Sequence, residues 1–123
     1  MKINQKEYFA EVNATAGNIA EMALEEKGWD REEAEEYIND SLLHENIDGH
    51  EWIIYTAYHL PIIQHSPNDE YMADNMGGLE ETVKEGGVQG LHMAMAFWAF
   101  YADVQEELEC ALDSAIETHE AAA

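Results

Sequence analysis

Apolar side chains recur at spacings of three, four and seven residues over most of the chain, which is the period of an α-helix. The first helix is predicted to follow Asn4, whose side chain can cap it, and to run to about Lys27. One face of this helix carries the apolar residues that we expect in the core, namely Tyr8, Val12, Ile19, Met22 and Ala23. Gly28 suits the left-handed cap at which such a helix ends.

A second helix is predicted from Asp30 to about His44. Asp30 and Glu33, three residues later, form the pattern of a capping box, and Trp29 can pack on Ala34 as a hydrophobic staple. The residues of this helix that we expect in the core are Ala34, Tyr37, Ile38 and Leu42.

The same start signal recurs at Asp48 and predicts a third helix. Glu51 completes the capping box, and Ile47 can pack on Trp52 as the staple. The helix is expected to end near Leu60, because Pro61 has no amide hydrogen and restricts the residue before it.

The second half of the chain is predicted to hold a short helix, a break and a long helix. The short helix begins at Ser66-Pro67 and stops at Gly77-Gly78. One or two helical turns over residues 79–85 are expected to end at Gly86-Gly87, and the long helix then runs from about Val88 to His119. Its two apolar stripes consist of Val88, Leu91, Met95, Trp98 and Ala102, and of Phe97, Tyr101, Val104, Leu108 and Ala111.

These elements predict an all-α fold, in which about five helices form a compact bundle with one long C-terminal helix. The chain has 123 residues, which is the size of one domain, and shows no internal repeat and no long linker. We therefore expect one acidic helical domain spanning residues 1–123.

Charge changes this picture from an ordinary helical domain to an unusual one. The chain has 27 Asp and Glu against 5 Lys and Arg, a formal net charge of −22 and a pI near 4.2. So few cations cannot form the basic face that direct nucleic-acid binding requires, and they disfavour docking on an anionic membrane. The N-terminus is polar, no apolar stretch is long enough to span a membrane, and Cys110 is the only cysteine. A reducing cytoplasm is the expected location, or the host cytoplasm if the chain is phage-encoded.

The acidic residues decorate every predicted helix and define the candidate binding surface. Within the long helix, Asp103, Glu106, Asp113, Glu117 and Glu120 follow one another at spacings of three, four and seven. The residues that we expect to contact a partner are Glu32, Glu33, Glu36, Asp40, Asp103, Glu106, Glu107, Glu109, Asp113 and Glu117. A helix with a carboxylate at each turn presents a rigid line of negative charge that resembles a nucleic-acid backbone. A solvated acidic face and adaptation to high salt are the two simpler explanations.

Residues that could carry catalysis or bind a metal form no strong pattern. His44, His50, His59, His65, His92 and His119 contain no His-Glu-x-x-His motif, although His59, His65 and His92 could form a site across helices. The acidic loop segments 46–49 and 68–70 lack the calcium-loop pattern. Cys110 lies among acids, which disfavour a thiolate, and the glycine pairs lack the lysine of a phosphate loop. We expect no catalytic residue, no metal site and no cofactor.

Two aromatic groups could be either core or interaction surface. They are the segment from Trp52 to Tyr58 and the cluster of Trp98, Phe100 and Tyr101. A domain of this size needs most of them inside. An aromatic side chain left exposed beside the acidic residues would mark a binding hot spot.

The combination of length, charge and helical pattern resembles the small acidic proteins that phages and mobile elements use against host defences. These include anti-restriction and anti-CRISPR proteins, several of which imitate DNA. The segment Asp48-Gly49-His50-Glu51-Trp52-Ile53-Ile54-Tyr55-Thr56, with Ser66-Pro67-Asn68 downstream, is also similar to small phage and prophage proteins. The resemblance implies a non-catalytic inhibitor whose partner is a basic nucleic-acid-binding protein or complex.

Two other hypotheses remain at this stage. The chain could be a helical adaptor or a homodimer that packs through the aromatic stripe of its long helix. It could also be a metal-binding protein built on its histidines. The three hypotheses differ in what each predicts for salt-sensitive binding, self-association and bound metal.

Overall fold

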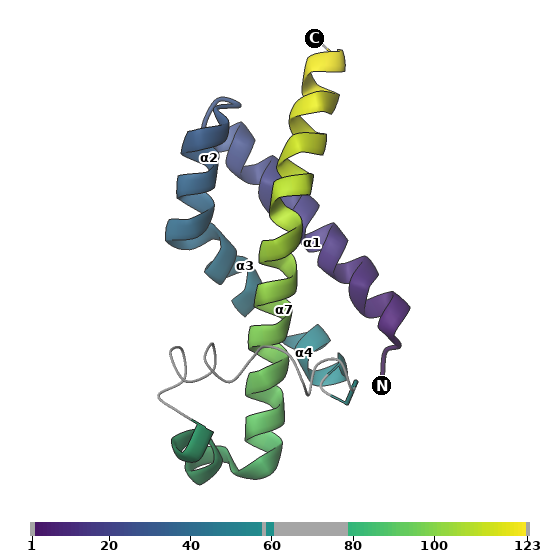
Figure 1. Ribbon diagram of the computed structural model, residues 1–123, viewed down its shortest axis with the longest axis vertical. Coiled ribbons are helices and arrows are strands. Elements are labelled where there is room, and N and C mark those ends of the chain that lie inside the picture. The colour runs from purple at the N-terminus through teal and green to yellow at the C-terminus, as the bar shows by residue number, and fades with distance from the viewer. Residues whose placement is uncertain (1, 58, 61–78, 123) are drawn as a thin grey trace.

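The computed structural model describes residues 2–57, 59, 60 and 79–122, apart from the side chains of Asp48, Glu51 and residues 79–94. Within these ranges the regular structure is helical, without a strand (Figure 1). The elements are α1 (Gln5–Glu26), α2 (Arg31–Tyr37), the π-helical turn η1 (Ile38–Leu42), α3 (Leu43–Asp48), α4 (Glu51–Ala57) and α7 (Leu79–Ala122). The all-α prediction and the long C-terminal helix are confirmed. The predicted short helix from Ser66 to Gly77 lies outside the described residues.

Both ends of α1 follow from the local sequence. The Asn4 side chain accepts from the backbone N–H of Glu7 at 2.8 Å, and Glu7 accepts from the N–H of Asn4 at 3.2 Å. At the other end Gly28 has a φ of 63°, and the N–H of Trp29 donates to the carbonyl of Leu24 at 2.7 Å. This is the pairing of a Schellman cap, which glycine enters without steric strain. The prediction for α1 is confirmed.

The second predicted helix is longer than expected, because α2, η1 and α3 follow one another without a break from Arg31 to Asp48. Asp30 caps it by accepting from the N–H of Glu33 at 3.1 Å. The wider turn of η1 places Ile38, Leu42 and Leu43 all in the core, where they are at most 6% exposed. A regular α-helix would rotate one of them away, so the π turn preserves the apolar face.

The third helix starts two residues later than predicted, because the predicted cap was Asp48 and the helix starts from His50. Asp48 is the last residue of α3, Gly49 caps that helix, and α4 begins at Glu51. The carbonyl of His50 accepts from the N–H groups of Ile53 and Ile54, so the new helix starts from His50. Trp52, the residue expected to pack on Ile47, is 53% exposed.

The glycine pair Gly86-Gly87 does not end a helix, since α7 runs through it from Leu79 to Ala122. Figure 1 shows that the first turns of α7, in dark green, lie at an angle to the rest of the helix. Residues without a Cβ offer little resistance to such a bend. The predicted break is therefore wrong, and the two C-terminal segments are one helix.

The core lies where α1 crosses α7, with α2 to α3 on one flank and α4 near the lower half of α7 (Figure 1). Its largest fully buried side chains include Tyr8, Ile19, Leu43, Ile53 and Phe100. Counting α2 to α3 as one, the described chain has four helices, so the predicted number of about five is approximate. Met22 was expected in the core but is 43% exposed.

Candidate functional site

Four acidic side chains predicted to contact a partner lie exposed on α2 and η1. They are Glu32, Glu33, Glu36 and Asp40. Three of these residues, Glu33, Glu36 and Asp40, line a shallow hollow of about 300 Å³ together with Lys27 and Tyr37. The ammonium of Lys27 lies 5.0 Å from the ring centroid of Tyr37, a cation–π contact that holds this cation at one edge of the acidic surface.

A second set of acidic side chains lies exposed on the outer face of α7. Glu106, Glu109, Asp113 and Glu117 are all exposed, and their spacing places them within about one third of the helix circumference. From Glu106 to Glu117 the helix rises about 16 Å. No lysine or arginine follows Lys84 in the sequence, so no cation of α7 itself interrupts this line.

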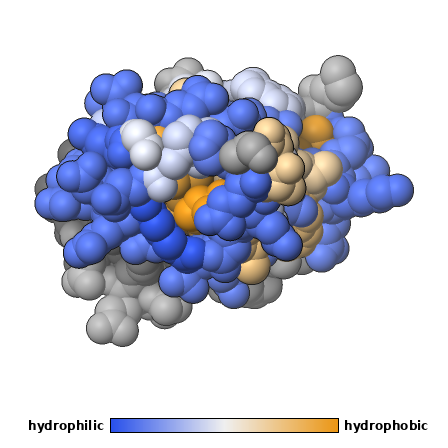
Figure 2. Space-filling view, turned by 90° about the horizontal axis from the view of Figure 1, so that it is seen from above, coloured by the Kyte–Doolittle hydropathy of each residue, from blue (hydrophilic) through white to orange (hydrophobic). Residues whose placement is uncertain are grey.

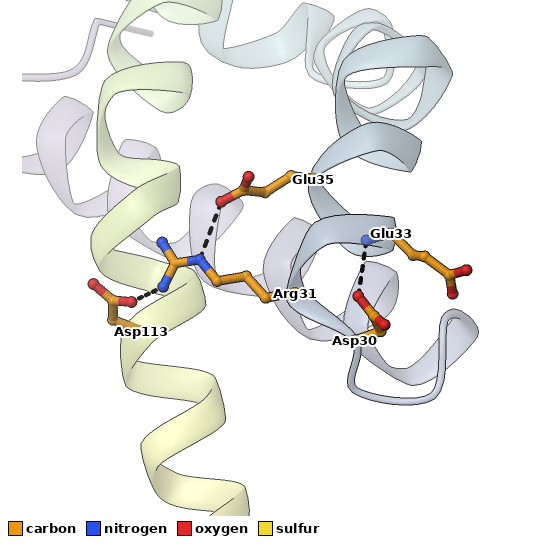
Figure 3. Close-up of polar contacts among 5 residues, drawn as sticks. All are labelled: Asp30, Arg31, Glu33, Glu35 and Asp113. Carbon is orange, nitrogen blue, oxygen red and sulfur yellow. Dashed lines mark hydrogen bonds and ion pairs between the residues drawn. The ribbon is translucent and has the colours of Figure 1, made fainter.

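Arg31 links α2 to α7 through Glu35, a half-buried acid that is not one of the four named above, and through Asp113, as Figure 3 shows. Its Nε donates to Glu35 of α2 at 3.0 Å, and its Nη1 donates to Asp113 of α7. Asp113 and Glu35 together raise the pKa of Arg31 above its ordinary value. The guanidinium therefore places carboxylates of α2 and α7 side by side. We call the exposed acids of α2, η1 and the outer face of α7 the acidic face: Glu32, Glu33, Glu36, Asp40, Glu106, Glu109, Asp113 and Glu117.

Asp103 differs from the other predicted contact residues because it is half-buried and bonded inside the chain. The hydroxyl of Tyr8, a residue only 1% exposed, donates to Asp103 Oδ2 at 2.5 Å. Burial raises the pKa of Asp103, the Tyr8 hydrogen bond opposes this effect, and the charges of Glu106 and Glu107 add to it. This geometry gives Asp103 a structural partner between α1 and α7.

A second polar contact fixes the segment between α3 and α4 against α1. His50 Nδ1 lies 2.6 Å from the backbone carbonyl of Asn46, which can only accept, so Nδ1 carries the hydrogen. His50 Nε2 lies 3.2 Å from the buried hydroxyl of Thr15 and 3.6 Å from Glu11 of the same helix.

Glu107 lies apart from the acidic face, in a hollow of about 860 Å³ between α1 and α7. The sequence analysis did not identify this groove. The signal that could have indicated it is Gly17, a glycine in the middle of a helix with no turn to explain it.

Neither a protein-family model, nor a curated protein, nor a solved structure matches the chain.

The aromatic groups divide between core and surface. Phe100 is buried, and Phe97 and Tyr101 are partly buried against the core. Trp52 and Tyr55 of α4 are 53% and 59% exposed. The aromatic side chains of α7 thus pack mainly on the core of the chain. Those of Trp52 and Tyr55 on α4 are exposed to solvent.

Within the described part of the chain, no three His, Cys, Asp or Glu side chains gather as a metal ion requires. His65 and the side chain of His92, two of the three histidines considered for such a site, lie outside it. Cys110 is exposed. No described helix combines the length and the apolar character that crossing a membrane requires.

Proposed function

We propose that this chain is a non-catalytic inhibitor of a nucleic-acid-binding host-defence protein or complex, of the anti-CRISPR or anti-restriction class. The acidic face occupies the positively charged groove in which that target holds nucleic acid. The observation that carries the proposal is the junction at Arg31, where carboxylates of α2 and α7 lie beside each other. Two helices that are distant in sequence thereby contribute to one anionic surface.

The balance of charge supports this proposal over a merely soluble acidic surface. A net charge magnitude of about 2–8 is enough to keep a small domain in solution. The chain carries −22, which destabilises the compact state through self-repulsion. Attraction of a strongly basic partner would explain why this destabilising charge is present, because opposite charge speeds association and fixes orientation.

The arrangement of charge also supports it. Glu106, Glu109 and Glu117 project from a helix whose backbone is rigid, so their spacing is set before a partner arrives. Preorganised charges lose little conformational freedom on binding. A phosphate backbone presents the same combination of regular spacing and high charge density to its binding proteins.

A second candidate function, a helical adaptor or homodimer, is favoured by the exposed Trp52 and Tyr55. Exposed aromatic side chains are enriched at the energetic centres of interfaces. The surface for such a contact would be α4 rather than the stripe of α7, since Phe97 and Tyr101 already pack on the core. This function predicts self-association that persists at high salt.

The test compares two triple variants with the same change in net charge. The first neutralises the acidic face with Glu106→Gln, Glu109→Gln and Glu117→Gln. The matched control neutralises exposed acids elsewhere, with Glu25→Gln, Glu26→Gln and Glu45→Gln. The proposal predicts that the first variant loses binding to nucleic-acid-binding proteins of a bacterial lysate, and that the control retains most of it. Equal loss in both would show that net charge alone is responsible.

A further inference from the structure

A groove of about 860 Å³ lies between α1 and α7. Small side chains form its floor: Ala14 and Gly17 from α1, and Ala111, Ser114 and Thr118 from α7. Trp29 is part of its lining where α1 ends. The surface seen from the C-terminal end of α7 is mostly hydrophilic, with a few apolar side chains visible between the polar ones (Figure 2).

The contacts within one copy of the chain do not explain why residue 17 is glycine. It lies in the middle of α1, where glycine destabilises a helix relative to alanine. A Cβ built on Gly17 meets no atom within 4 Å, so packing inside the chain does not require the glycine. A glycine of this kind leaves space in which another backbone can approach the helix closely.

An aromatic contact joins the two sides of the groove at the end where Trp29 lies. Trp29 has a φ of 65°, which is uncommon for a large side chain, and its ring stacks on His119 with centroids 3.7 Å apart and planes 7° from parallel. The stack connects the turn after α1 to the last turns of α7.

Charge decides which kind of partner fits. Glu21 and Glu107 line the groove, and none of its lining residues is a lysine or arginine. A second copy of the chain would bring another net charge of −22 to this surface. A helix with lysine or arginine along its edges would find carboxylates on both helices and a floor without bulky side chains.

We propose that this groove binds a cationic helix of a partner protein. The small or apolar face of that helix lies against Gly17 and Ala111, and its basic residues reach Glu21 and Glu107. The groove differs from the acidic face, which lies on α2 and on the part of α7 that Arg31 contacts. The proposal therefore does not depend on nucleic-acid mimicry, and separate variants test the two surfaces.

The test uses the full chain and a defined probe, a helical peptide of about 18 residues with lysine on one face and alanine on the other. Cys110 lines the groove and is exposed, so its alkylation by a maleimide reports occupancy. We expect the peptide to slow this reaction and to shift the backbone amide resonances of Ser114 and Thr118. Gly17→Leu, which fills the groove from an open position, should weaken binding by at least about tenfold, measurable by titration.

Two further variants separate the contributions. Glu21→Gln with Glu107→Gln should weaken peptide binding, whereas Glu106→Gln, Glu109→Gln and Glu117→Gln should leave the Cys110 protection in place. Far-UV circular dichroism verifies that each variant keeps its helix content. This triple variant also separates the groove proposal from the inhibitor function. It should lose binding at the acidic face and keep binding of the peptide in the groove.

Three results would overturn the proposal. Resonance shifts confined to α2 and the outer face of α7, with unchanged affinity in Gly17→Leu, would place the peptide elsewhere. Equal binding of an uncharged helical peptide would contradict the requirement for a cationic partner. Self-association of the chain that disappears in Gly17→Leu would show that a second copy occupies the groove.

Discussion

Tyr8 and Asp103, which are 95 positions apart in the sequence, meet in a hydrogen bond of 2.5 Å between the two longest helices of the chain. Tyr8 is buried away from water, so its hydroxyl needs an acceptor within the chain, and Asp103 is that acceptor. The same contact gives the Asp103 carboxylate a donor within the chain. Asp103 thus links the packing of α1 on α7 to the distribution of charge.

We expect Tyr8→Phe to lower the free energy of unfolding by about 1–2 kcal/mol, because it leaves the half-buried Asp103 carboxylate without its donor. Urea unfolding at pH 7 measures the change. Tyr55→Phe is the matched control, since that tyrosine is 59% exposed, and it should change stability by less than about 0.5 kcal/mol. Equal effects of both substitutions would contradict a structural role for the hydrogen bond.

Asp103→Asn is expected to stabilise the protein at pH 7. Burial raises the pKa of Asp103 above its ordinary value of 3.8, so the folded state favours the protonated form. Protonated Asp103 therefore stabilises the folded state. This stabilisation is complete below pH 3.8 and is lost as the pH rises through the raised pKa of Asp103 in the folded state. The asparagine variant keeps an acceptor for Tyr8 and carries no charge. The difference in free energy of unfolding between Asp103→Asn and the original chain should shrink from pH 7 towards pH 4. A difference that grows over this range would contradict a raised pKa of Asp103.

Two glycine substitutions should act in opposite directions. Gly17→Ala places a methyl group in open space within a helix, and we expect it to stabilise the fold by about 0.5–1 kcal/mol. Gly28→Ala has the same change in volume but a φ of +63°, and it should destabilise by about 1 kcal/mol or more. Thermal unfolding of both variants provides the comparison. Destabilisation by Gly17→Ala would mean that the glycine is required by packing within the chain.

Salt should stabilise the folded chain, because a net charge of −22 is screened as ionic strength rises. Arg31→Gln removes the cation between Glu35 and Asp113 and should cost at most about 1 kcal/mol at low salt, since the pair is exposed. That cost should diminish at 0.5 M NaCl, where the Debye length is only about 4 Å. A melting temperature that falls with added NaCl would refute the screening argument.

Local signals predicted the helices whose ends are set by local chemistry. Asn4 and Gly28 fix α1, and Asp30 fixes the start of α2, because each cap depends on residues within a few positions. The continuation through Asp48 and through Gly86-Gly87 depends on what the helix packs against, which periodicity does not report. Asp48 looks like a cap in sequence, but Ile47 is fully buried and keeps α3 helical up to that point.

The candidate site was predictable in composition but not in arrangement. The sequence identifies which residues are acidic, and helical spacing groups those of α7. It does not reveal that Arg31 links α2 to α7, that Tyr8 donates to Asp103, or that Glu107 lines a hollow shared with α1. Each of these facts depends on how distant helices cross, which only the fold determines.

The most direct test of the inhibitor function is capture of proteins from a bacterial lysate on the immobilised chain, followed by elution with duplex DNA. We expect that nucleic-acid-binding proteins are retained and that DNA displaces them. The variant Glu106→Gln, Glu109→Gln and Glu117→Gln should abolish their retention, while the matched control at Glu25, Glu26 and Glu45 should not. Retained proteins that DNA fails to displace, or that bind both triple variants equally, would contradict it.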